Sequence, residues 1–236
     1  MTDLFAVVDG TWPAATRIHA GGFCIRQGQG GGSRVSSASL VVPLDQADLD
    51  TAIAAHRAMG QQPRFMIRPE DTALDAALEA RGYELYDPVV VYQAEIGDLP
   101  DTAPPMAAIP HWPPLAIAQD IWAQGDIGPA RLAIMHRAAG AKTAMLGRVD
   151  DRAAGVAFVA LHQDTAMLHA LYVPPDFRRL GLAQAIMAAS VNWAAAQGAK
   201  RFALVVTRAN EGARALYERI GLHPVSRYHY RREVAQ

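Results

Sequence analysis

A proline-rich segment between residues 99 and 115 is the feature that most restricts how this chain can fold. It reads LPDTAPPMAAIPHWPPL. Each proline fixes φ and lacks an amide donor, so this segment cannot form a helix interior or a central strand. We therefore predict a linker at 99–115, an N-terminal domain at 1–98 and a C-terminal domain at 116–236. With 236 residues, 51% of them apolar, the chain is long enough for two small cores.

The composition excludes several classes of protein. The formal net charge is −1 and the charges are scattered, so we expect neither a nucleic acid nor a membrane as partner. The single cysteine, Cys24, allows no internal disulfide and no thiolate cluster, so we expect no metal. The start MTDLFAVVD lacks the features of a signal peptide, and no run of about 18 apolar residues follows. These features predict a cytoplasmic protein.

The C-terminal part alternates strand and helix patterns. Three strand-like runs are separated by short polar turns, which predicts an antiparallel meander; they span 142–149, 155–161 and 166–173. Apolar residues at helical spacing predict helices at 129–139, 179–197 and 211–220. A buried apolar run predicts a strand at 201–207, and a final strand pair is predicted at 222–231. This order predicts an α/β fold with one crossover helix.

The N-terminal half has a similar texture. Strands are predicted at 23–26, 35–42, 64–68 and 89–93, and helices at 48–59 and 72–81. Residues 28–32 are glycine-rich, but no Lys-Ser or Lys-Thr follows, so we interpret them as a mobile hairpin turn rather than a phosphate loop. The segment PRFMIR…ALEARGYELYDP echoes KRFALV…ALYERIGLHP. This echo favours a divergent duplication, although any strand-helix-glycine-strand unit could produce it by chance.

The segment VPPDFRRLGLA, residues 173–183, carries the clearest chemical signal. It joins the third meander strand to the helix that follows, and Gly181 and Ala183 leave the backbone amides uncovered. A helix N-terminus offers unpaired N–H groups and a partial positive charge. Arg178 and Arg179 add full charges. The segment therefore predicts a binding site for a pyrophosphate.

Two motifs together resemble the GNAT superfamily of acyl-CoA N-acyltransferases. The first is Arg178-x-x-Gly181-x-Ala183, preceded by LHALYVPP, and the second is Asn210-x-x-Ala213-x-x-x-Tyr217-x-x-x-Gly221-Leu222. The resemblance covers residues 116–236 and implies the GNAT fold, a mixed, mostly antiparallel sheet flanked by helices. It also implies that acetyl-CoA is the co-substrate and that a small-molecule or peptide amine accepts the acetyl group by direct attack in a ternary complex.

The resemblance assigns roles to particular positions. The tyrosine that matches Tyr217 lies beside the sulfur as the acid, although its ring could merely pack on the helix face. The strand near Leu171 and Val173 is expected to splay from its neighbour, so that backbone amides bind the thioester carbonyl and the pantetheine. The cofactor-binding residues implied are Leu171, Val173, Arg178, Arg179, Leu180, Gly181, Leu182, Ala183, Asn210 and Ala213.

The base that takes the amine proton is less clearly marked. Many family members have a glutamate where this chain has Met167, which cannot act. His169 lies two residues further on, so strand alternation places it on the same face. The stretch AMLHALYV resembles the arylalkylamine N-acetyltransferase branch, in which histidines on this strand relay the proton. His169 is therefore the candidate base, and a water relay is the alternative.

The first half lacks the corresponding groups. The segment PLDQADLD stands where a phosphate turn would be, and Leu78 is opposite Tyr217 in the echo. Because acidic residues repel a pyrophosphate, we expect no second cofactor site. This half resembles the N-terminal half of bacterial two-part GNAT proteins and is expected to complete the sheet or wall the acceptor site. The alternative function is a non-catalytic acyl-CoA-binding or sensing module; the acceptor, set by the variable segment 116–139 and loops, and the oligomeric state stay open.

Overall fold

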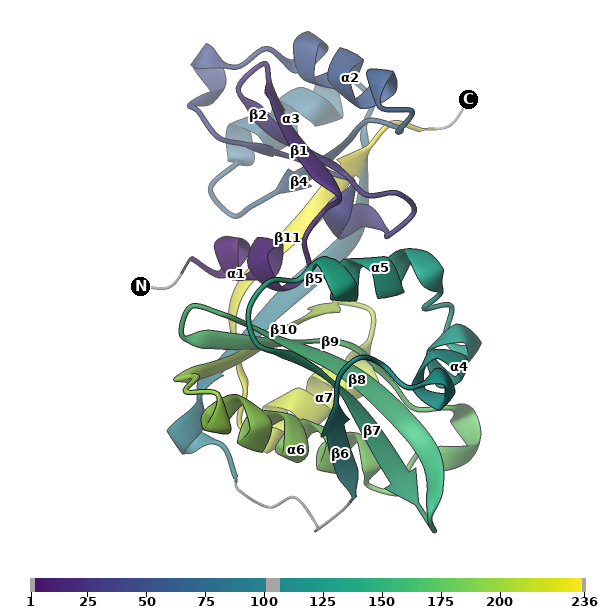
Figure 1. Cartoon of the computed structure of the whole chain (residues 1–236). Helices are drawn as coiled ribbons and strands as arrows, with labels where there is room; N and C mark the ends of the chain where they lie inside the picture. Colours follow the sequence, from purple (N-terminus) through teal and green to yellow (C-terminus); the bar gives the residue numbers. More distant parts are fainter. Residues whose placement is uncertain (1–2, 101–106, 235–236) are drawn as a thin grey trace. The chain divides into compact units, whose positions relative to one another are not determined.

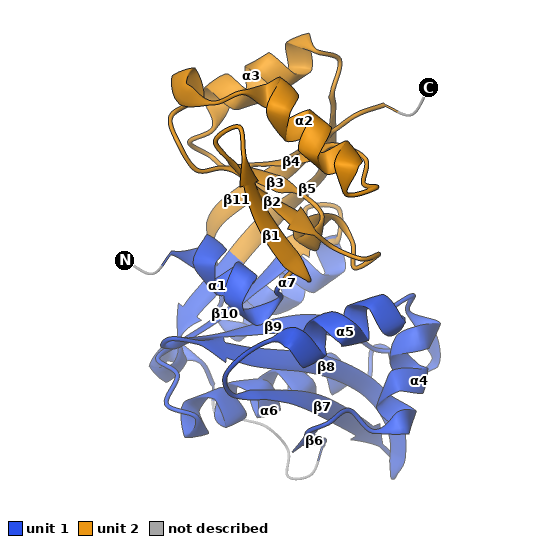
Figure 2. Cartoon of the chain, turned by 45° about the horizontal axis from the view of Figure 1, so that its top comes forward, with its two compact units in different colours: residues 1–13, 92–205, 211–224 blue, residues 14–91, 206–210, 225–236 orange. Residues whose placement is uncertain are grey.

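The computed structural model describes residues 3–100 and 107–234 (Figure 1). Contacts divide these residues into two compact units (Figure 2). Unit 1 comprises Met1–Pro13, Tyr92–Val205 and Glu211–Pro224, and unit 2 comprises Ala14–Val91, Val206–Asn210 and Val225–Gln236. Each unit thus combines segments from both sides of the predicted linker. Within that linker, residues 101–106 lie outside the described residues, and Ala108–His111 form a strand.

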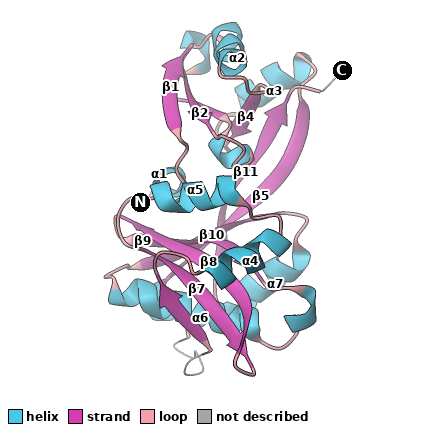
Figure 3. Cartoon of the chain, turned by 45° about the vertical axis from the view of Figure 1, so that its right-hand side comes forward, coloured by secondary structure: helices cyan, strands magenta, loops and turns pink. Residues whose placement is uncertain are grey.

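Unit 1 is built on a mixed sheet with the strand order β10-β9-β8-β7-β6 (Figure 3). Its strands are β6 (Ala108–His111), β7 (Lys142–Val149), β8 (Arg152–His162), β9 (Thr165–Tyr172) and β10 (Arg201–Thr207). Strands β6 to β9 pair antiparallel, and β9 pairs parallel with β10. The predicted meander is confirmed. Its first strand has the predicted bounds, because polar turns at Asp150 and Asp151 mark its end.

The described part of unit 1 contains five α-helices. They are α1 (Leu4–Thr11), α4 (Ala116–Gln124), α5 (Pro129–Arg137), α6 (Leu182–Ala196) and α7 (Glu211–Ile220). Helix α6 is the predicted crossover between β9 and β10, and it packs against β6 to β9. Helices α1 and α4 both pack against β8 and β9. Val7 and Val8 of α1 form a buried cluster with Met167 of β9 and Ala203 of β10.

Two glycines let α6 approach the sheet closely. Gly147 of β7 and Gly155 of β8 are cross-strand partners. A Cβ atom on Gly147 would lie 2.7 Å from Ile186 Cδ1, and one on Gly155 would lie 3.0 Å from Leu182 Cδ2. Leu182 and Ile186 lie in the first two turns of α6. Because the two glycines let these side chains approach the sheet, they set the position of the helix N-terminus.

Gly147→Ala is expected to lower the free energy of unfolding by about 1–3 kcal/mol, because the added methyl overpacks the contact with Ile186 and Leu182. Urea unfolding followed by circular dichroism measures the change. Gly97→Ala is the matched control, since a Cβ on Gly97 meets nothing within 4 Å. Equal midpoints for the two variants would contradict the tight fit.

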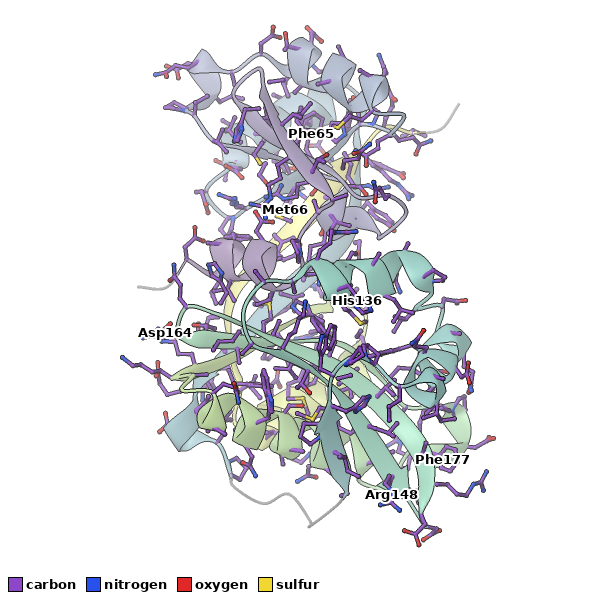
Figure 4. The ribbon with its side chains drawn as sticks, in the orientation of Figure 1. Phe65, Met66, His136, Arg148, Asp164 and Phe177 are labelled. Atoms are coloured by element: carbon purple, nitrogen blue, oxygen red, sulfur yellow. The ribbon has the colours of Figure 1, made fainter. Side chains whose placement is uncertain are left out.

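Unit 2 has a sheet with the strand order β1-β2-β3-β4-β11. Its strands are β1 (Thr16–Ala20), β2 (Phe23–Gln27), β3 (Ala38–Leu40), β4 (Arg64–Ile67) and β11 (His223–Arg232), whose first two residues are grouped with unit 1. Strand β5 (Glu84–Glu95) is divided between the units after Val91. Helices α2 (Leu49–Ala58) and α3 (Thr72–Ala80) complete unit 2, and its core includes Phe65 (Figure 4).

Several predicted elements of unit 2 are corrected. The region predicted as one strand at 35–42 begins at the last residue of a 3₁₀ turn, Ser33–Val35, and includes only the three-residue strand β3. The predicted final strand pair is one continuous strand, β11, which pairs antiparallel with β4, with Tyr230 opposite Met66. Residues 229–232 of β11 therefore pair with a strand of unit 2, the unit that contains most of the N-terminal half. Helix α1 and strand β1 have no counterpart among the predicted elements.

Candidate active site

The segment after β9 forms a tight turn at the edge of unit 1. A short 3₁₀ helix, Pro175–Phe177, follows Pro174, and the Nε of Arg178 donates to the carbonyl oxygen of Val173 at 2.9 Å. The guanidinium of Arg152 lies 5.3 Å from the centre of the Phe177 ring. Figure 4 shows Phe177 in the loop between β9 and α6. These contacts hold the turn as a defined structure.

The N-terminus of α6 is open to a ligand. Gly181 is its N-cap residue with φ 77°, and no side chain caps the helix. Arg179 is also left-handed, with φ 65°, which is uncommon for a residue with a side chain. A Cβ on Gly181 would meet nothing within 4 Å. Uncapped amides in a left-handed turn, next to exposed Arg178 and Arg179, are the features that favour an anion at a helix N-terminus.

The pairing of strand β9 with β8 is irregular just before this turn. Val156 pairs with Tyr172 and Phe158 with His169, so β9 contains one extra residue between these pairs, a β-bulge. Ala170 within the bulge has φ 52°. The parallel pairing of β9 with β10 runs from Thr165 to Leu168 and does not extend over the rest of β9. The two strands therefore part at Leu168, as the sequence predicts for the region of Leu171.

His169 lies in a buried environment in unit 1. Its side chain is 4% exposed and its ring stacks on Trp12, with 4.9 Å between the ring centres. Its Nε2 lies 2.9 Å from Oγ1 of Thr11, and that hydroxyl donates to the carbonyl oxygen of Val7 at 2.7 Å. Since a hydroxyl has one proton and that of Thr11 is donated to Val7, Nε2 of His169 is the donor in the contact with Thr11.

Tyr217 lies on α7 with 6% of its surface exposed. Its ring meets the ring of Tyr92 edge-on, with 6.0 Å between centres, and its hydroxyl has no hydrogen-bond partner among the described residues. Tyr92 is held in turn, because its hydroxyl donates to Glu218 Oε1 at 2.6 Å and accepts from Arg214 Nε at 3.3 Å. Burial raises the pKa of Tyr217 to about 12. The hydroxyl therefore stays protonated at neutral pH.

The structure brings the predicted residues together only in part. Leu171, Val173 and residues 178–183 form one continuous segment at the end of β9. Asn210 is exposed and grouped with unit 2, and its backbone N–H donates to the carbonyl oxygen of Thr207. Ala213 lies in the first turn of α7. The ring contact of Tyr217 within the described part of the chain is with Tyr92 and not with His169.

The sequence did not predict the contacts that three further residues make with strand β9. Thr11 and Trp12 contact His169, and the indole Nε1 of Trp122 donates to the carbonyl oxygen of Ala170 at 2.8 Å. Thr11 is 158 positions from His169 in the sequence, and Trp122 is 48 positions from Ala170, so no local pattern could reveal these hydrogen bonds. Within residues 3–100 and 107–234, no three His, Cys, Asp or Glu side chains are grouped to hold a metal ion. None of the helices in those ranges has the length and apolarity to span a bilayer.

Comparison with known proteins identifies the domain. A GCN5-related N-acetyltransferase from Kribbella flavida is 20% identical, with a TM-score of 0.76 over 98% of this chain and 94% of the other. A protein of unknown function from Staphylococcus epidermidis is 14% identical, with a TM-score of 0.70 over 100% and 98%. A tandem GNAT protein from the clavulanic acid biosynthesis pathway is 12% identical, with a TM-score of 0.60 over 100% and 90%.

These similarities are structural and show a shared GNAT fold, including its two-part form. A comparison with curated proteins finds no match. Residues 112–222 match the Acetyltransferase (GNAT) family, and this range contains the bulged strand, the open helix N-terminus and Tyr217. The chain therefore carries an acetyltransferase domain of the GNAT family at residues 112–222.

Proposed function

We propose that unit 1 is an N-acetyltransferase that transfers the acetyl group of acetyl-CoA to a primary amine in a ternary complex. One observation carries the proposal: the bulged end of β9 leads, through the turn at residues 173–181, into the uncapped N-terminus of α6. A strand end that exposes backbone amides can bind an acyl carbonyl, and a helix N-terminus can bind a pyrophosphate. Acetyl-CoA carries both groups.

The residues of the turn fit the phosphates of coenzyme A. The amides of residues 181–183 lie at a helix start without a side-chain cap, and Arg178 and Arg179 are exposed beside it. By contrast, α2 in unit 2 is capped by Asp48, whose carboxylate accepts from the amides of Asp50 and Thr51. A negative charge already occupies that helix start. We therefore place a single cofactor site in unit 1.

Calorimetric titration with acetyl-CoA is expected to give one site per chain. Gly181→Asp should weaken binding at least tenfold, because it puts a carboxylate at the helix start and a side chain at φ 77°. Gly198→Asp is a suitable control, since Gly198 follows the other end of α6, also has positive φ and has open space around it. Two sites per chain would contradict the assignment of unit 2 as degenerate.

The transfer step requires a neutral amine and a polarised thioester. The amine nitrogen attacks the carbonyl carbon, a C–N bond forms and the C–S bond breaks, with the electron pair leaving on sulfur. We assign the backbone amides of Leu171 and Val173 to the thioester carbonyl and the pantetheine, because the bulge and the end of pairing with β10 lie beside them.

Tyr217 is assigned to the leaving sulfur. Burial raises the pKa of Tyr217 to about 12, well above that of a thiol, so complete proton transfer to the thiolate is uphill. A hydrogen bond from the neutral hydroxyl to the developing thiolate has no such cost. Tyr217 therefore stabilises the departing sulfur as a donor, and the proton that finally neutralises it comes from the attacking amine.

His169 is assigned as the acceptor of the amine proton, with water as the alternative. Because Nε2 carries the hydrogen toward Thr11, the lone pair of the neutral ring is on Nδ1. With 4% of the side chain exposed, a proton reaches this atom through one or more waters or through a change in the Trp12 contact.

His169→Gln is expected to remove the acidic limb of the pH profile of kcat/KM and to lower kcat/KM about 10²-fold at pH 7. The pH dependence of kcat/KM for acetyl-CoA is measured at a saturating concentration of an amine found by screening. His162→Gln is the matched control, because His162 lies at the β8 end of the same hairpin. An unchanged profile in His169→Gln would assign the proton to water.

The competing function is a module that binds acyl-CoA without turnover, which the methionine at position 167 in place of an acid favours. Release of thiol from acetyl-CoA in the presence of an amine panel separates the two functions. Amine-dependent thiol release supports the enzyme. Binding of acetyl-CoA without release on any amine supports the module.

A further inference from the structure

Trp122 is a fully buried tryptophan on α4 that contacts the bulge of β9. Its indole Nε1 donates to the carbonyl oxygen of Ala170 at 2.8 Å. Ala170 has the left-handed conformation, with φ 52°, that defines the bulge. An alanine adopts this conformation only where its surroundings hold it there, because the Cβ atom crowds the backbone. The indole hydrogen bond is such a constraint.

The same contact fixes the direction of the next amide. A trans peptide group is planar, and its C=O and N–H point in opposite directions. When the Ala170 carbonyl is directed at the indole of α4, the N–H of Leu171 is directed away from α4. Trp122 therefore sets the orientation of an amide that it does not touch.

The end of α4 also contacts Tyr172, the residue that follows Leu171. The hydroxyl of Tyr172 donates to the carbonyl oxygen of Gln124 at 3.2 Å. Gly125, the C-cap residue of α4, lies so close that a Cβ atom there would be 2.5 Å from the Tyr172 ring. Helix α4 thus holds β9 at residues 170 and 172, on both sides of Leu171.

We propose that Trp122 is a positioning residue, which orients the Leu171 amide toward the thioester carbonyl of acetyl-CoA through its hydrogen bond to Ala170. The inference rests on the proposed function, because it needs the Leu171 amide to bind that carbonyl. In this role, helix α4 keeps the acyl-binding amide in place before the ligand arrives.

The test removes one N–H and keeps the ring. Trp122→benzothienylalanine, made by nonsense suppression, replaces the indole N–H with sulfur in a ring of nearly the same shape, and Trp122→Phe is the genetic counterpart. Trp112→Phe is the matched control, because Trp112 packs against Phe158 and His136 in the same unit. Both tryptophans are aromatic packing residues, but only the Trp122 indole is bonded to the bulge among the described residues.

Two measurements follow the carbonyl itself. Isotope-edited infrared difference spectra of bound [1-¹³C]acetyl-CoA report the C=O stretch, which a hydrogen bond lowers. Calorimetry compares the affinities for acetyl-CoA and for S-ethyl-CoA, which lacks the carbonyl. We expect the Trp122 variants to shift the stretch back toward its value in water and to lose preference for acetyl-CoA over S-ethyl-CoA. We also expect kcat/KM for acetyl-CoA to fall about tenfold to a hundredfold, because the hydrogen bond to the carbonyl is lost in both the bound state and the transition state.

The outcomes separate this inference from the proposed function. If the wild-type protein binds no acetyl-CoA, or shows no shifted carbonyl, the proposed function fails at its first step. If the wild type shows the shift and benzothienylalanine at position 122 leaves it unchanged, the positioning role is overturned while the transferase proposal stands. A shift lost in both Trp122 variants and kept in Trp112→Phe supports the role.

Discussion

Tyr217→Phe is expected to lower kcat about 10- to 100-fold and to leave KM for acetyl-CoA within about twofold. The hydroxyl is the only part removed, and the ring keeps its contact with Tyr92. A donor that strengthens only as the sulfur becomes negative acts on the transition state, so its loss appears in kcat. Steady-state assays of thiol release with a saturating amine measure both constants.

The donor role also predicts how the loss depends on the leaving group. Replacing acetyl-CoA with an acetyl thioester of a more acidic thiol should shrink the difference between wild type and Tyr217→Phe, since a better leaving group needs less stabilisation. Tyr86→Phe in unit 2 is the control for loss of a tyrosine hydroxyl. Full turnover in Tyr217→Phe would show that the Tyr217 hydroxyl takes no part in the reaction.

Between pH 7 and pH 5, the protein is expected to lose about 2 kcal/mol of its free energy of unfolding through one histidine, His56. This residue is fully buried in unit 2, beside the ring of Phe65, and burial lowers its pKa to about 4. No hydrogen bond of normal geometry reaches either ring nitrogen within the described residues. Burial is the largest cause that opposes the charge on His56, and the positive charge of Arg64 adds to it.

The direction of the effect follows from proton binding. In the unfolded chain His56 has a pKa near 6.5, so between pH 6.5 and pH 4 the unfolded state binds a proton that the folded state does not. Stability from this group is therefore present above pH 6.5 and is lost as the pH falls toward 4. The lost amount at pH 5 is close to 2 kcal/mol.

His56→Leu tests the effect, because leucine is similar in size and cannot titrate. Urea unfolding at several pH values should show that the gap between variant and wild type widens by about 2 kcal/mol from pH 7 to pH 5, in favour of the variant. His19→Leu is the comparison, since His19 is exposed on β1. Parallel pH curves for His56→Leu and wild type would contradict the buried, neutral state of His56.

The sequence predicted those elements that local patterns define. Strands β7 and β10 and helix α7 have the predicted bounds, since turn residues or glycine mark their ends and the apolar period identifies their type. Helix α1 was missed because it is only eight residues long and its sequence includes Gly10. Strand β11 was predicted as two strands, because its burial varies along the chain and its pairing with β4 joins residues more than 150 positions apart.

The turn at residues 173–183 was available from sequence because its chemistry is local. Gly181, the arginines and the helix start are contiguous, and a helix N-terminus binds anions whatever surrounds it. The sequence thus predicted the kind of ligand, the strand that leads to its site and the half of the chain that would bind it. The hydrogen-bonding state of His169, the pKa of Tyr217 and the left-handed Ala170 were decided only by tertiary structure. Each depends on groups distant in sequence, namely Thr11, the burial of α7 and Trp122, and only the folded chain brings such groups within hydrogen-bond distance or excludes water from them.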